Sequence, residues 1–101
     1  MSELLPLITP GEILAEEFME PLGISQNRLA RDMDVPVSRV SGIIRNERAI
    51  TGDTALRLAA FFGTTPEFWM NLQADHDLRA ARRSKGNEIT ARVRPLVVKA
   101  A

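Results

Sequence analysis

The chain contains no cysteine and no tyrosine, and it has one histidine and one tryptophan among its 101 residues. Without cysteine there is no disulfide, no thiolate metal ligand and no cysteine nucleophile. The single histidine leaves few side chains that can move a proton near neutral pH. We therefore expect no enzyme, no bound metal and no cofactor.

Long hydrophobic runs are also missing. The longest apolar run covers residues 58–62, whereas a membrane-spanning helix needs roughly 18 apolar residues. The N-terminus opens with Ser2 and Glu3 and has no basic residue before an apolar stretch, which does not match a secretory signal. The sequence predicts a cytoplasmic protein without membrane contacts and with one modest hydrophobic core.

The net charge is zero, but the two signs are segregated along the chain. Residues 1–24 hold five acidic residues and no basic one, whereas residues 78–101 hold seven basic residues and one acidic. Residues 25–48 carry five arginines against three acids. A chain of this kind is expected to bind a polyanion only locally, not over its whole surface.

Helix start and stop signals divide the chain into five predicted helices, which makes the fold class all-α. Thr9-Pro10-Gly11-Glu12 has the pattern of a capping box with proline at the first helical position. Thr51 or Asp53 caps the fourth helix, and Gly63 ends it. The predicted helices cover about residues 10–20, 26–33, 37–45, 52–62 and 66–82.

Residues 84–101, which follow a predicted domain of residues 1–83, form a basic C-terminal tail. Gly86 is expected to break the preceding helix. The tail then forms either a short helix that ends before Pro95 or a strand, because apolar residues alternate over 89–97. A solvated terminus, phosphate contacts and docking on a partner all remain open for this segment.

The second and third predicted helices, joined by a tight turn, describe a helix-turn-helix. Ala30 is small where the two helix backbones must cross, and Val35 is an apolar residue in the turn. Val40 and Ile43 face the core from the second helix. The opposite face has no acidic residue and ends in an arginine, which suits a major groove between two rows of phosphates.

Five residues of this opposite face are candidates for contacts inside the groove. Arg45 suits a forked contact with guanine or a phosphate contact, and Ser38 and Ser41 suit base edges or backbone oxygens. Val37 suits a thymine methyl group. Gly42 has no side chain and is expected to let the helix approach the DNA closely.

Four further residues are candidates for phosphate contacts at the rim. Gln26 begins the first helix of the pair, where its amide and the helix N-terminus can bind one phosphate. Arg39, Asn46 and Arg48 are candidate phosphate clamps. Each of these residues alone is more simply a solvated surface residue, and only the whole set favours DNA binding.

Two other patterns, an aromatic run and an Asp-His-Asp run, are explained by structure and not by ligand binding. Phe68, Trp69 and Leu72 have helical spacing and are expected to pack in the core, with Trp69 also a candidate for a dimer contact. A ligand-binding box is the alternative. Asp75–Asp77 suggests metal binding at first sight. Adjacent helical residues point about 100° apart, so these three cannot share one ion, and His76 is expected at a surface or an interface.

The stretch from Ile24 to Asn46 resembles the helix-turn-helix of the phage-repressor-like XRE regulators. Over about residues 8–96 the chain is more closely similar to the HigA family of antitoxins. The most specific shared run is Pro66-Glu67-Phe68-Trp69-Met70-Asn71-Leu72-Gln73. The other shared motifs are Thr9-Pro10-Gly11-Glu12-Ile13-Leu14, Leu29-Ala30, Val35-Pro36-Val37-Ser38-Arg39, Ile43-Ile44, Arg48-Ala49-Ile50-Thr51, Asp53-Thr54-Ala55-Leu56-Arg57-Leu58, Phe62-Gly63-Thr64 and Asp77-Leu78.

This resemblance implies a five-helix phage-repressor-like fold and a cytoplasmic homodimer that represses its own operon through a palindromic operator in double-stranded DNA. It also implies a co-encoded toxin, a ribosome-dependent mRNA endoribonuclease, which the chain binds and neutralises. The alternative is a stand-alone prophage-type repressor without a toxin partner. Asp34 departs from the glycine or asparagine that is common in the turn, but aspartate tolerates the left-handed conformation that the turn needs.

Overall fold

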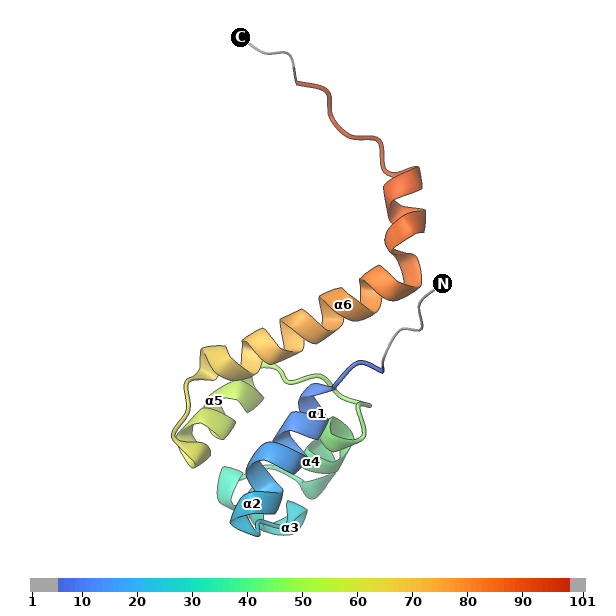
Figure 1. Cartoon of the computed structure of the whole chain (residues 1–101). Coiled ribbons are helices and arrows are strands. Elements are labelled where there is room, and N and C mark those ends of the chain that lie inside the picture. The colour runs from blue at the N-terminus through green and yellow to red at the C-terminus, as the bar shows by residue number, and fades with distance from the viewer. Residues whose placement is uncertain (1–5, 99–101) are drawn as a thin grey trace.

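The computed structural model describes residues 6–98, and every regular element in that range is a helix (Figure 1). α1 (Pro10–Ile13), η1 (Leu14–Met19) and α2 (Glu20–Leu22) follow one another without a break and form the first helical segment. The other segments are α3 (Gln26–Met33), α4 (Val37–Ile44), α5 (Gly52–Phe62) and α6 (Pro66–Arg92). The prediction of an all-α fold with five helical segments is confirmed. None of the helices described is long and apolar enough to cross a membrane.

Hydroxyl side chains cap four of these segments, and the predicted cap at Thr9 is among them. Thr9 forms both hydrogen bonds of a capping box with the third residue of α1, at 3.1 and 3.4 Å. Ser25, Thr51 and Thr65 each accept a hydrogen bond from the backbone N–H three residues later. Thr51, and not Asp53, is the N-cap of α5. The aspartate is therefore available for other contacts.

The first segment contains a wider, π-helical stretch, η1, just before Pro21. Proline has no N–H, and its ring collides with the carbonyl four residues earlier in an α-helix. Widening the helix relieves this collision, and the Glu20 N–H donates to the carbonyl of Ala15, five residues back. Gly23, in the left-handed conformation with φ 65°, then ends the segment.

Two tight turns on either side of α4 depend on residues other than glycine in the left-handed region. Asp34 has φ 59° and Asn46 has φ 60°. After each one, a backbone N–H reaches back five residues: Val35 to Ala30 at 3.0 Å, and Glu47 to Gly42 at 2.8 Å. These bonds satisfy the free carbonyls at the ends of α3 and α4. The tolerance expected of Asp34 is confirmed.

The core lies between the first four helical segments and the N-terminal part of α6. Trp69 is fully buried, and its ring centroid lies 4.8 Å from that of Phe18. Its indole N–H donates to Thr64 Oγ1 at 2.7 Å. The predicted core role of Trp69 is confirmed. The dimer contact suggested for Trp69 is wrong, because the side chain is fully buried. The buried apolar set is Leu14, Met19, Leu29, Ala30, Met33, Val40, Ile43, Ile50, Ala55, Leu58, Ala59 and Trp69.

α6 is longer than the sequence predicted. It runs through Gly86 to Arg92, and residues 93–98 follow it without regular structure. The expected break at Gly86 and the alternative of a strand over 89–97 are therefore wrong. One glycine costs a helix only about 1 kcal/mol relative to alanine, which the helical residues on both sides tolerate. Figure 1 shows that α6 bends towards its C-terminal end and projects, with residues 93–98, away from the other helices.

Gly11 determines how closely α1 approaches α4. A Cβ atom built on Gly11 would collide with the carbonyl oxygen of Ile43 and would lie 2.7 Å from the Cα of Ile44. Since both are backbone atoms, rotating a side chain cannot relieve the collision. A glycine is therefore required where the two helix backbones meet.

We predict that Gly11→Ala lowers the free energy of unfolding by roughly 1–3 kcal/mol, the usual cost of overpacking a core, because α4 must move outward. Urea unfolding followed by circular dichroism measures this change. Gly52→Ala is the matched control, since a Cβ there meets nothing within 4 Å. Equal stability of the two variants would show that the α1–α4 contact is looser than described.

Candidate nucleic-acid interface

α3 and α4 pack against each other as the sequence predicted. Leu29, Ala30 and Met33 are buried on α3, and Val40 and Ile43 are buried on α4. Ala30 lies 3% exposed, which fits a small residue where two helices cross. These side chains hold the inner faces of the pair together, whereas Val37 and Ser38 on α4 remain exposed.

The outer face of α4 carries polar and small apolar side chains. Val37 is 44% exposed, and Ser38 is exposed beside it. The Ser41 hydroxyl donates to the carbonyl of Val37 at 3.0 Å, which leaves its oxygen lone pairs able to accept a hydrogen bond. These three residues lie together, as the helical spacing predicted.

Arg45 follows the last residue of α4, and its side chain is 65% exposed. Its Nε lies 3.7 Å from Oε1 of Glu47, whose side chain is equally exposed. An ion pair this long and this solvated contributes little to stability. The guanidinium of Arg45 is therefore able to exchange this partner for another anion.

Gly42 is not on the exposed face of α4, where the sequence predicted it. It is buried, because the aliphatic part of Arg48 covers it: a Cβ on Gly42 would lie 2.8 Å from Cδ of Arg48. The missing side chain thus makes room for Arg48 and not for a close approach of DNA. Asn46 is exposed and lies in the left-handed turn between Gly42 and Arg48.

Gln26 is the first residue of α3, and its side chain is exposed. The hydroxyl of the capping Ser25 accepts the N–H of Arg28. The first N–H groups of α3 therefore point out of the helix without an intrahelical acceptor, as in any helix start. This end of α3 is suited to an anion, which is the arrangement that the sequence predicted for Gln26.

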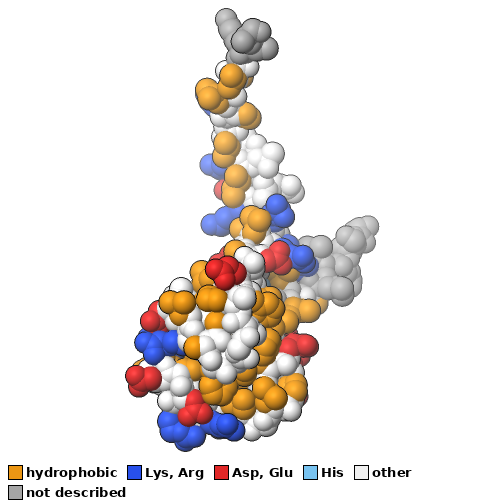
Figure 2. Space-filling view, turned by 90° about the vertical axis from the view of Figure 1, so that its left-hand side faces the viewer, with side chains coloured by type: hydrophobic (Ala, Val, Ile, Leu, Met, Phe, Trp, Pro, Cys, Tyr) orange, Lys and Arg blue, Asp and Glu red, His pale blue; other side chains and the backbone are white. Residues whose placement is uncertain are grey.

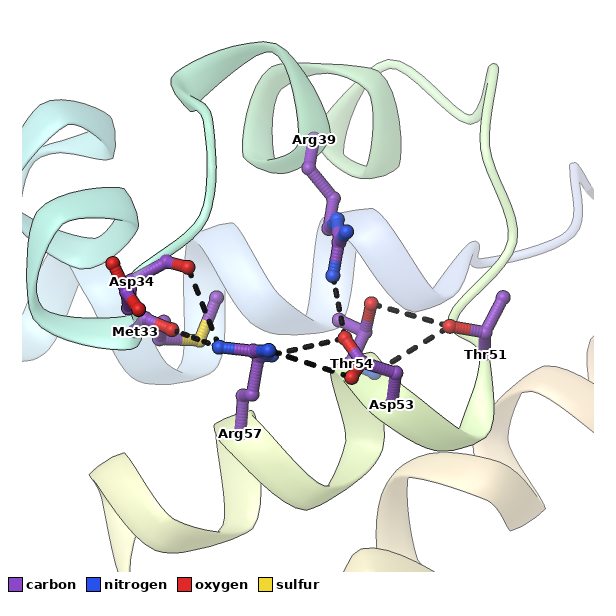
Figure 3. Close-up of polar contacts among 7 residues, drawn as sticks. All are labelled: Met33, Asp34, Arg39, Thr51, Asp53, Thr54 and Arg57. Atoms are coloured by element: carbon purple, nitrogen blue, oxygen red, sulfur yellow. Dashed lines mark hydrogen bonds and ion pairs between the residues drawn. The ribbon is translucent and has the colours of Figure 1, made fainter.

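Arg39 is held in an ion-pair cluster that spans three helices (Figure 3). Its Nη1 donates to Oδ2 of Asp53 on α5 at 2.6 Å. Arg57, one turn further along α5, donates to the same oxygen through Nε at 2.9 Å. Arg57 Nη1 also donates to the backbone carbonyls of Met33 at 2.8 Å and Asp34 at 3.3 Å. This cluster connects the turn of the helix-turn-helix to α5.

Both guanidiniums stabilise the ionised form of Asp53. The hydrogen bonds from Arg57 and then Arg39 hold the pKa of the Asp53 carboxyl below its usual range, against a smaller opposing effect of desolvation. In turn, Asp53 raises the pKa of Arg57. A hollow of about 400 Å³ opens beside the cluster and is lined by three arginines and one carboxylate, together with alanine and threonine. Its lining residues are Arg39, Arg48, Ala49, Thr51, Asp53, Thr54 and Arg57.

Sequence reasoning missed Asp53 and Arg57 as parts of this site. Their spacing of four residues on one helix was the available signal, because such pairs face each other on a helix surface. The third member, Arg39, lies 14 residues before Asp53. These two side chains meet because α4 and α5 both pack against α3.

The residues that suggested a metal site have separate partners. Asp75 pairs with Arg79 at 3.1 Å, and Asp77 accepts a hydrogen bond from Gln73 at 2.9 Å. His76 is half-buried and lines a different hollow, beside residues 6–10. Within residues 6–98 no group of three or more acidic, histidine or cysteine side chains has an arrangement that could hold a metal ion.

Comparison with known proteins gives consistent matches along the chain. A helix-turn-helix family model matches residues 16–69. Virulence-associated protein I of Dichelobacter nodosus is 46% identical over 81 residues, which are 80% of this chain and 75% of that protein. Antitoxin HigA-1 of Vibrio cholerae is 42% identical over 91 residues, which are 90% of this chain and 85% of that protein.

Among solved structures, the Pseudomonas aeruginosa antitoxin HigA with the higBA promoter has a TM-score of 0.84 and 41% sequence identity. The match covers 89% of this chain and 98% of that chain. The fold and the matched family model define a protein of the helix-turn-helix class. Within that class, the chain belongs to the HigA family of antitoxins.

The lowered pKa of Asp53 makes the stability of the fold dependent on pH in acid. The folded chain favours the ionised carboxylate of Asp53. Its contribution to the free energy of unfolding is therefore fully present above the unfolded pKa of about 3.9. The contribution is lost as the pH falls through the folded pKa. We predict that the difference in unfolding free energy between the native chain and Asp53→Asn is constant from pH 7 to 5 and shrinks below about pH 4.

Urea unfolding at several pH values measures this difference. Asp32→Asn is the control, since Asp32 pairs only with arginines of its own helix, Arg28 at 3.4 Å and Arg31 at 3.6 Å. If the difference at pH 3 equals the difference at pH 7, the ion pairs of Asp53 do not stabilise the folded chain.

Proposed function

We propose that the chain is a DNA-binding antitoxin that represses its own operon. The observation that carries this proposal is the outer face of α4, which has no acidic residue and is presented by a helix whose inner face is buried. In this proposal the outer face of α4 lies in the major groove. The P. aeruginosa HigA structure with the higBA promoter supports DNA as the ligand.

In this proposal, the residues of α4 read bases and the residues around it bind phosphates. Arg45 contacts guanine through two hydrogen bonds, Ser38 and Ser41 contact base edges, and Val37 contacts a thymine methyl group. The exposure of Val37, Ser38 and Arg45, and the free lone pairs of the half-buried Ser41, support these roles.

Gln26 and the start of α3 bind one phosphate, and Asn46 and Arg48 bind phosphates at the other rim. Arg39 lies beside this surface but is occupied by Asp53. Gly42 acts indirectly, since it gives room to the stem of Arg48. A base contact specifies the sequence, whereas a phosphate contact fixes the register of the helix on the duplex.

A palindromic operator requires two copies of the chain, because one chain carries one recognition helix. In a homodimer, the two α4 helices enter successive major grooves about 34 Å apart. Figure 2 shows hydrophobic side chains along the projecting end of α6 and residues 93–98. Ile89, Val93 and Leu96 are exposed there, and Leu96 is 87% exposed. This apolar surface supports association with a second copy.

The chain also neutralises a co-encoded toxin, in this proposal an endoribonuclease that cleaves mRNA on the ribosome. The similarity to HigA-1 of V. cholerae, named as an antitoxin, supports this part. The site of action is then the cytoplasm. The two ligands are coupled, because a toxin that binds the DNA-free and DNA-bound forms unequally changes the operator affinity.

We predict that Arg45→Ala weakens operator binding by about 1–3 kcal/mol and relaxes the preference for one base pair. Competition titrations with operators altered at single positions measure both effects, and saturation is expected at two chains per palindrome. Arg79→Ala is the matched control, because Arg79 has similar exposure, 62%, and a carboxylate partner, but lies on α6. Unchanged affinity and unchanged base preference in Arg45→Ala would remove Arg45 from the base-reading set.

We also predict that the product of an adjoining short, basic reading frame co-purifies with the chain when the two are expressed together. Growth arrest by that product alone, and relief of the arrest by this chain, measure neutralisation directly. A chain that binds its operator but has no such neighbour would instead be a stand-alone repressor.

A further inference from the structure

The carboxylate of Asp53 lies in a hollow whose other charged side chains are all arginines. The hollow beside α4 has three arginines and this single acid. An acid beside a DNA-binding face opposes the attraction of phosphates. A function of Asp53 in this hollow therefore has to offset its repulsion of phosphates.

The two arginines that pair with Asp53 differ in how many hydrogen bonds hold them. Arg57 is fixed by bonds to both oxygens of Asp53 and to two backbone carbonyls at the turn after α3. Arg39 has one short bond, through Nη1, and its side chain is 31% exposed. Arg57 therefore anchors Asp53, and Arg39 is the member that can be released without breaking the anchor.

We propose that Asp53 is a specificity-determining residue that withholds Arg39 from DNA phosphates. This proposal rests on the DNA-binding function proposed above. While Arg39 is bound to Asp53, the protein offers one cation fewer to any DNA backbone. Attraction to phosphates is independent of sequence, so withholding a cation weakens binding to unrelated DNA.

The operator complex depends less on this cation than a nonspecific complex does. Base contacts fix the register of α4 on the operator, and Arg39 then stays on the side of α4 that faces α5. A nonspecific complex has no fixed register and can shift to use any free cation. The Asp53–Arg39 pair therefore lowers nonspecific affinity more than operator affinity, which raises the ratio between the two.

Asp53→Asn tests this inference, because the amide keeps an acceptor for Arg57 but loses the charge that holds Arg39. Fluorescence anisotropy titrations across a salt series are made with operator DNA and with a scrambled duplex. For the scrambled duplex we expect the slope of log affinity against log salt to steepen by about 0.9, one more neutralised phosphate. At 0.1 M salt this corresponds to about eightfold tighter nonspecific binding, and the preference for the operator falls.

Two further variants separate the inference from general effects. Asp75→Asn removes the same charge from an exposed ion pair on α6 and is expected to leave the slope unchanged. In an Arg39→Gln background, adding Asp53→Asn is also expected to leave the slope unchanged, because Arg57 remains bound to the turn. Circular dichroism confirms that each variant is folded.

Three results would overturn the inference: equal effects of Asp53→Asn and Asp75→Asn, parallel weakening on both duplexes, or a steeper slope that persists with Gln at position 39. A native chain that binds operator and scrambled DNA equally would contradict the proposed function instead. The slope on the scrambled duplex would still test Asp53 in that case.

Discussion

The close approach of α1 to α4 at Gly11 is the constraint on which the rest of the structure depends. There the backbone of one helix lies against the backbone of the other, with no room for a side chain. This contact fixes the distance between α4 and α1 and places Val40 and Ile43 in the core. The outer face of α4, with Val37 and Ser38, consequently points away from the core and stays exposed.

Polar contacts then fix the orientation that apolar packing leaves open. Arg57 connects the turn after α3 to α5, and through Asp53 to α4. On the opposite side, the buried Gln73 of α6 accepts a hydrogen bond from the backbone N–H of Ile50 at 2.7 Å, just before α5. Because Gln73 is 8% exposed, this bond is shielded from water and worth more than a surface bond. With this support, α4 is positioned by rigid elements and not by loops.

Local sequence patterns predicted most of the fold. The features that they did not predict depend mainly on contacts between distant segments. Capping motifs, the left-handed turn at Asp34 and the apolar stripes depend on neighbouring residues, so the sequence shows them directly. The continuation of α6 through Gly86 was missed because one glycine is a weak helix breaker. The burial of Gly42 and the pairing of Arg39 with Asp53 were missed because their partners lie on other segments.

The central claim is that the outer face of α4 recognises one DNA sequence through base contacts, supported by phosphate contacts. The most direct test is a fluorescence anisotropy titration of the native chain with its own upstream DNA, using a scrambled duplex as competitor and a range of salt concentrations. The account predicts preferential binding to the upstream DNA, with an affinity that falls as the salt concentration rises. Equal binding to both duplexes, repeated with the neighbouring gene product present, would contradict it.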